Sequence, residues 1–263
     1  MLDYCAWDEA GGFSRCVKAR FHFSPFQHPR SSFIFPCFVN PLKSFFSSSI
    51  GRKWIVAVTG LVLFGFVVGH LVGNLQVFLG GESLNRYGAF LQGTGELLWV
   101  VRFALLLMLV LHIVYTVKLR IENRAARPIG YAVTKRMATS FAARMMLWSG
   151  LMVLCFIIFH ILHFTAQTVD PAFRTLHDSL GRHDVYQMMI RGFTNRWASA
   201  FYIVGVGLLA MHLNHGIQSL FQTLGLNSAK VRAFWEQGGR IISWAIFLGY
   251  ASMPVAVLAG LLK

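Results

Sequence analysis

Charged residues are scarce in this chain: only 13% of its 263 residues are Asp, Glu, Lys or Arg, whereas 56% are hydrophobic. A soluble domain would have about a quarter of its residues charged. Acidic residues are the scarcest, with ten against 24 basic ones, and none falls inside the long apolar runs. The composition therefore excludes an ordinary soluble globule and indicates a protein that crosses a membrane several times.

Cysteine pairs and nucleotide-binding signatures are also missing. The four cysteines are Cys5, Cys16, Cys37 and Cys155, and none forms a Cys-x-x-Cys pair. No iron–sulfur cluster, zinc site or covalently attached c-type haem is therefore indicated. The chain has no glycine-rich nucleotide fingerprint either, so dehydrogenase and nucleotide-hydrolase chemistry finds no support.

Five apolar segments are each close to the ~20 residues needed to cross ~30 Å of hydrocarbon. We expect all of them to be helices, because backbone polar groups in lipid must be satisfied within the segment. The predicted fold is an all-α membrane protein with one transmembrane domain, residues 51–263. The expected spans are approximately Trp54–Leu79, Leu97–Leu119, Met145–Thr168, Trp197–Phe221 and Ile241–Leu262.

The first 50 residues differ in composition, being rich in Phe, Ser and Pro without clear periodicity. We expect a tail that is disordered or an annotation extension, with translation beginning near Val39. A transit peptide is the alternative, and the acidic residues Asp3, Asp8 and Glu9 argue against it. No internal repeat of fixed period is apparent in the chain.

Basic residues concentrate in alternate loops, which predicts the topology. The positive-inside rule places basic loops on the cytoplasmic side, so the N-terminus is expected to be cytoplasmic and the C-terminus outside. The loop between the second and third spans has a single acid, Glu122. Its basic residues are Lys118, Arg120, Arg124, Arg127, Lys135, Arg136 and Arg144.

Four of the five spans each have a histidine at a similar depth. Each histidine follows the charged residue that opens its span by 16 or 17 positions, about 25 Å along a helix. The first and third spans run outward and the second and fourth run inward. Two pairs are therefore expected, an outer pair of His70 and His160 and an inner pair of His112 and His212.

Ionisable side chains inside a membrane are rare and mark functional sites. Neutral imidazole is a good iron ligand, and haem iron takes one or two such axial ligands. The pairs therefore predict a bundle around two haems, with His70, His112, His160 and His212 as iron ligands. One alternative to iron binding is a purely structural role, in which the histidines form hydrogen bonds between helices. A histidine-relay transporter is another, although such sites usually include an intramembrane acid.

Two further histidines lie one helical turn beyond proposed ligands. His163 follows His160 by three residues, and His215 follows His212 by three. Residues at this spacing are neighbours on a helix surface. Spacing alone leaves open whether His163 or His215 replaces its neighbour as the ligand.

The histidine segments resemble a known family, the cytochrome b558 anchor of succinate dehydrogenases and fumarate reductases, in its single-subunit, five-helix, dihaem type. The resemblance covers about residues 40–263 and includes four motifs in order. They are "GHLVGN" around His70, "LHIVY" around His112, "FHILHF" around His160 and "HLNHG" around His212. In the family the fourth ligand lies four residues before a glycine, which selects His212, with Gly216, over His215.

The resemblance implies two haem b groups and an electron path to a membrane quinone, with menaquinone as the expected species. A flavoprotein subunit and an iron–sulfur subunit would dock on the cytoplasmic face of a bacterial inner membrane. Succinate would be oxidised in the flavoprotein, so this chain would be the quinone-reactive electron-transfer subunit. Other classes left open are the haem b subunit of a hydrogenase or formate dehydrogenase, and a haem-free transporter.

Two charged residues near the outer end of the second span complete the predicted site. Glu96 is a candidate proton port for a quinone, and the alternative is a solvated acid at a positive helix end. Arg102 is a candidate contact for a haem propionate, because guanidinium pairs with carboxylate through two hydrogen bonds. A snorkelling interfacial arginine is the competing interpretation.

Overall fold

A computed structural model describes residues 45–126, 141–228 and 230–263 of the chain. Two compact units are distinguished, Met1–Gly51 and Arg52–Lys263. In the first unit, the Ser48 hydroxyl accepts a hydrogen bond from the Gly51 N–H at 3.0 Å. The predictions for residues 1–44, including a start near Val39, lie outside the described residues, as do the basic residues Arg127, Lys135 and Arg136.

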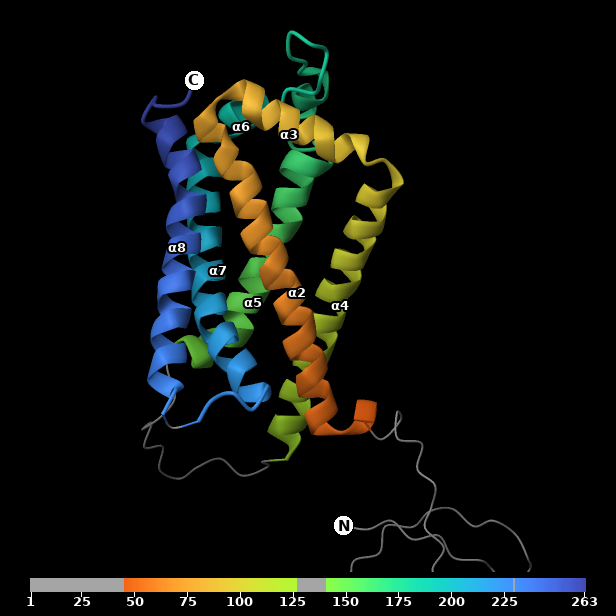
Figure 1. Cartoon of the computed structure of the whole chain (residues 1–263), viewed down its shortest axis with the longest axis vertical. Helices are drawn as coiled ribbons and strands as arrows, with labels where there is room; N and C mark the ends of the chain where they lie inside the picture. Colours follow the sequence, from red (N-terminus) through yellow and green to blue (C-terminus); the bar gives the residue numbers. More distant parts are fainter. Residues whose placement is uncertain (1–44, 127–140, 229) are drawn as a thin grey trace, which may run out of the picture. The chain divides into compact units, whose positions relative to one another are not determined.

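Within the described residues, five helices are long and apolar enough to cross a membrane, as the sequence predicted. The part of the chain that the structure describes contains no β-strand. The long helices are seen in Figure 1. They are α2 (Ser49–Leu75) with its 3₁₀ extension η1 (Gln76–Leu79), α4 (Glu96–Ala125), α5 (Phe141–His160) with its π-helical extension η2 (Ile161–Thr165), α7 (Arg196–Thr223) and α8 (Arg232–Leu258).

The boundaries of the fifth span differ most from the prediction. It was expected at Ile241–Leu262, but α8 runs over Arg232–Leu258. Hydropathy detects only the apolar part of a helix, whereas backbone hydrogen bonding continues through the polar turns at its beginning. The helix ends before Gly260, whose φ of +73° is a left-handed conformation that favours glycine.

Two shorter helices lie between the spans. Helix α6 (Val185–Thr194) begins after Asp184, whose carboxylate caps it by accepting from the Gln187 N–H at 2.9 Å. Its apolar face is buried rather than lying free on a surface, with Met189 and Phe193 in the core. Helix α3 (Gly81–Gly93) was not predicted, since its sequence is too polar to read as a span.

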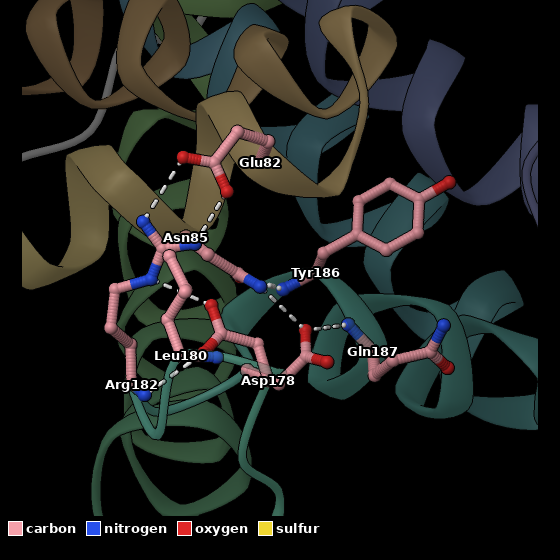
Figure 2. Close-up of polar contacts among 8 residues, drawn as sticks. Glu82, Asn85, Asp178, Leu180, Arg182, Tyr186 and Gln187 are labelled. Carbon is pink, nitrogen blue, oxygen red and sulfur yellow. Dashed lines mark hydrogen bonds and ion pairs between the residues drawn. The ribbon is translucent and has the colours of Figure 1, made fainter.

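A polar network ties α3 to the loop before α6 (Figure 2). The Asn85 side chain donates to the Asp184 carboxylate at 3.0 Å and accepts from the Tyr186 N–H at 2.9 Å. Arg182 donates to both carboxylate oxygens of Glu82, at 3.2 and 2.6 Å, and to Asp178 at 2.7 Å. We call these interactions the Arg182 network; they fix the loop on α3 without an apolar core of its own.

Arg182 also determines the acidity of its two partners. Its hydrogen bond to Glu82 lowers the pKa of that exposed carboxyl. For Asp178, desolvation would raise the pKa, but hydrogen bonds from the Arg182 side chain and from backbone N–H groups outweigh it, and the pKa is lowered. The pKa of Arg182 itself is raised by its hydrogen bonds to Glu82 and Asp178. All three groups are therefore charged near neutral pH.

The long helices are not packed equally. Helix α7 runs alongside both α5 and α8, and its Tyr202 lies in the core with Ile246 and Met253 of α8. By contrast, α4 has no buried residue along its thirty positions. It meets α2 through individual side chains, including an ion pair between Arg52 and Glu122 and a contact between Thr59 and His112. Side chains rather than close helix packing connect α4 to its neighbours.

Candidate functional site

The structure brings the four predicted histidines together in two pairs. The His70 ring on α2 lies next to His160 on α5, with ring centroids 5.7 Å apart and planes at 81°. The His112 ring on α4 lies next to His212 on α7, with centroids 6.5 Å apart and planes at 67°. We call these the 70/160 pair and the 112/212 pair. Four different helices thus contribute one ring each.

The spacing within each pair suits a shared metal ion. Two imidazoles that bind one ion from opposite sides, with metal–nitrogen bonds of about 2 Å, have ring centres roughly 6 Å apart. Both observed separations, 5.7 and 6.5 Å, are close to that value. In the described residues no cluster of three or more His, Cys, Asp or Glu side chains could hold a metal, so a paired-histidine site is the arrangement available.

The second nitrogen of each ring has a hydrogen-bonding partner. In all four histidines that nitrogen is Nδ1, and among the described residues no hydrogen bond reaches Nε2. Such contacts fix the tautomer and orientation of ligating histidines. The partners are Asn74 for His70 at 3.3 Å, Thr59 for His112 at 3.2 Å, Tyr202 for His160 at 3.2 Å and Ser149 for His212 at 3.3 Å.

The partners of the 112/212 pair are compatible with a proton on Nδ1 of each ring. The Thr59 hydroxyl lies 2.7 Å from the Ile55 carbonyl, and the Ser149 hydroxyl lies 3.2 Å from the Met146 carbonyl. A hydroxyl that donates its one proton to its own backbone has its oxygen left to accept from the histidine. This arrangement allows both rings the form with the proton on Nδ1 and a free lone pair on Nε2, which is the form that binds a metal.

His160 shares its partner with His163. The Tyr202 hydroxyl lies 3.2 Å from Nδ1 of His160 and 3.3 Å from Nδ1 of His163. With a single hydroxyl proton, it accepts from one ring and donates to the other. The π-helical turn η2 begins directly after His160; such turns often occur at functional sites. This arrangement allows His160 the same Nδ1–H form as the 112/212 pair.

His70 differs from the other three. Its partner is the Asn74 amide nitrogen, which also donates to the His70 carbonyl at 2.7 Å. An amide nitrogen is only a donor, so in this arrangement Nδ1 of His70 accepts and the proton of the neutral ring lies on Nε2, unlike the form that binds a metal through Nε2. The ring is further held by Phe66, stacked at 5.2 Å and 20°.

The remaining sequence candidates are not members of either pair. His163 is buried against Phe164 and Phe173, and Nδ1 of His215 is buried with no hydrogen-bond partner in the described part of the chain. Glu96 is an exposed residue in the first turn of α4. Arg102 is exposed as well, and its guanidinium lies over the Trp99 ring at 4.9 Å. The structure brings none of Glu96, Arg102 or His215 to a ring pair.

A cavity of about 480 Å³ lies beside His163. His163 lines it and links it through Tyr202 to His160. The lining combines aromatic rings with a few polar side chains, a common composition for small-molecule sites. The lining residues are Phe159, His163, Val169, Asp170, Phe173, Arg191, Gly192, Asn195, Trp197, Ala198 and Phe201.

Sequence reasoning missed the residues that orient the rings, although a signal for two of them is present. The segments "TGLVLFGFVVGH" of α2 and "SGLMVLCFIIFH" of α5 align ninety positions apart. Each has a hydroxyl residue and a glycine at the start and a pair histidine at the end. Because no single period links all the spans, a search for a repeat of fixed period does not detect this similarity between two of them. Tyr202 and Asn74 leave no comparable pattern.

Comparison of the chain with family models, with curated proteins and with solved structures gave no match. The functional interpretation therefore depends on the residues and their geometry.

Proposed function

We propose that this chain is a dihaem cytochrome b that anchors a succinate:quinone oxidoreductase in a bacterial inner membrane. The observation that supports it most is the pair of histidine couples: four rings from four membrane-length helices, each with Nδ1 engaged and Nε2 free of hydrogen bonds. If the histidines served only in packing, nothing would require the ring spacing of both pairs to match that of two imidazoles that share one metal ion.

The residues present fit haem. His70 and His160 would hold one haem b and His112 and His212 the other, through Nε2. For His70 this requires the ring proton to move from Nε2 to Nδ1, with the Asn74 side chain turned to accept it. Bound haem supplies one-electron redox chemistry, which a membrane electron carrier requires. The chain's own contribution is to hold four rings in fixed orientations and to keep water from them with the apolar helices.

Quinone exchange is assigned to the same end of the molecule as the 70/160 pair. Glu96 remains the proposed proton port and Arg102 the proposed propionate contact, as the sequence suggested. The cavity lined by His163 and Asp170 is a second candidate for the quinone headgroup, because its aromatic walls and polar groups suit a flat ring with two oxygens. Menaquinone is the proposed species.

The family resemblance supplies the partners in the proposal. A flavoprotein subunit and an iron–sulfur subunit would dock on the cytoplasmic side and carry out the succinate chemistry. The chain would then be non-catalytic for succinate and active in electron transfer.

Purification of the tagged chain from its native membrane tests the proposal. We expect flavin, iron–sulfur centres and haem b to co-purify, with succinate-dependent reduction of the haem. Haem b with a hydrogenase or formate dehydrogenase instead would move the chain to another respiratory complex. A folded chain without haem would overturn the proposal.

A further inference from the structure

Thr59 and Ser149 occupy equivalent positions in the two halves of the bundle. Each is a small hydroxyl residue followed by glycine, eleven positions before a pair histidine on its own helix. Neither contacts that histidine. Thr59 on α2 contacts His112 on α4, and Ser149 on α5 contacts His212 on α7. Two different helices therefore present the same short motif to the two members of one histidine pair.

We propose that Thr59 and Ser149 are positioning residues for the 112/212 pair, acting through a duplicated hydroxyl–glycine motif that fixes each ring with Nε2 toward the other. The proposal rests on the proposed function, because it assigns these residues a role toward the haem that the 112/212 pair would bind.

Each hydroxyl also contacts its own helix backbone. Thr59 lies 2.7 Å from the Ile55 carbonyl and Ser149 lies 3.2 Å from the Met146 carbonyl, so each can donate there and accept from its ring. A short side chain bonded to its own backbone is held rigidly, so the accepting oxygen is placed by the helix rather than by a mobile side chain. Both oxygens lie close to the ring nitrogen, at 3.2 Å for Thr59 and 3.3 Å for Ser149.

The glycines bring the helix backbone close to the rings. A Cβ atom on Gly60 would lie 3.1 Å from Cε1 of His112, and one on Gly150 would lie 3.3 Å from Cε1 of His212. Both distances are shorter than ordinary van der Waals contact. The motif thus combines an acceptor for Nδ1–H with a surface that admits the edge of the ring, and a larger residue at either glycine would displace the ring.

A general packing role for buried hydroxyls does not account for this. Ser243 on α8 is also buried and also donates to its own helix, to the Gly239 carbonyl at 2.7 Å. It has no glycine after it and no histidine partner. Ser243 is therefore a matched control: the same side chain with the same backbone bond but without a ring to orient.

The test compares Ser149→Ala and Thr59→Val with Ser243→Ala in the purified complex or full-length chain. The readouts are haem b content and the midpoint potential of each haem, separated by optical and EPR redox titration. A histidine that donates from Nδ1 is a more basic ligand, which favours ferric iron. Losing the acceptor should therefore raise the potential of one haem and weaken its retention by about 10-fold to 100-fold.

Each variant removes the hydroxyl that lies next to Nδ1 of its ring, Thr59 for His112 and Ser149 for His212. We expect both variants to act on the same haem, and Ser149→Thr and Thr59→Ser to keep the wild-type potential.

Three outcomes decide the proposal. A shift in the same haem for Ser149→Ala and Thr59→Val, absent in Ser243→Ala, supports it. Two haems with unchanged potentials in both variants would overturn it while leaving the proposed function intact. A wild-type chain that binds no haem would remove the proposed function and this inference together.

Discussion

The two histidine pairs have similar ring separations, but different kinds of side chain hold their rings. The 112/212 pair is oriented by Thr59 and Ser149, short side chains attached rigidly to helix backbones. The 70/160 pair is oriented by longer side chains, the Asn74 amide and the Tyr202 hydroxyl. Substitutions of these partner residues should therefore affect one pair and leave the other unchanged.

The surroundings of the pairs differ in the same direction. Aromatic rings crowd the 70/160 pair, with Phe156 and Phe164 beside His160. Glycines Gly60 and Gly150 adjoin the 112/212 pair instead. The first pair is therefore surrounded by side-chain rings and the second is approached by helix backbones.

The largest predicted effect comes from removing a ligand. His112→Ala should lower haem b from about two to about one per chain, because each haem would depend on its own pair. His70→Ala should do the same and leave the other haem spectrum. Pyridine haemochrome content and optical spectra of the two variants measure this. Equal loss of both haems from every single variant would contradict independent pairs.

A smaller loss of haem is expected when a residue that orients a ring is replaced. Tyr202→Phe removes the hydroxyl shared by His160 and His163, so the 70/160 haem should be retained about 10-fold less well, with the 112/212 haem unchanged. Haem loss during dilution gives the measurement. Tyr250→Phe is the matched control, since the Tyr250 hydroxyl donates to the Val67 carbonyl at 2.7 Å. An equal effect of the control would show that only packing was disturbed.

Acid should loosen the loop beside α3. The pKa values of Glu82 and Asp178 are lowered in the folded protein. Their stabilisation is therefore present above their unfolded pKa values, about 4, and is lost as pH falls through the folded values. Hydrogen-exchange mass spectrometry should show faster exchange in residues 176–184 at pH 3 than at pH 7. Arg182→Gln should already exchange faster at pH 7, and exchange unaffected by either change would contradict the role of the Arg182 network.

The smallest predicted effect concerns His215. Its ring is not part of either pair, so His215→Ala should retain two haems with unchanged spectra. Loss of the 112/212 haem from this variant would reverse the assignment between His212 and His215. The matched comparison is His212→Ala, for which loss of that haem is expected.

Sequence reasoning gave the five helices and the pairing of the rings, because hydropathy and helical rise fix how deep a residue lies. It did not give α3, whose polar composition hides its helical structure. It also missed Tyr202 and Asn74, whose positions depend on how helices rotate about their axes. That rotation is set by packing and cannot be read from spacing alone. The hydroxyl–glycine repeat, visible in the printed sequence, gained meaning only once Thr59 and Ser149 were seen to contact the opposite helices.

The central claim is that both histidine pairs bind haem. Purified chain, supplied with haem during expression, should contain about two haem b per polypeptide by pyridine haemochrome, with the low-spin spectrum of iron held by two histidines. A folded chain that binds none would contradict the account and leave the histidines as packing or transport residues.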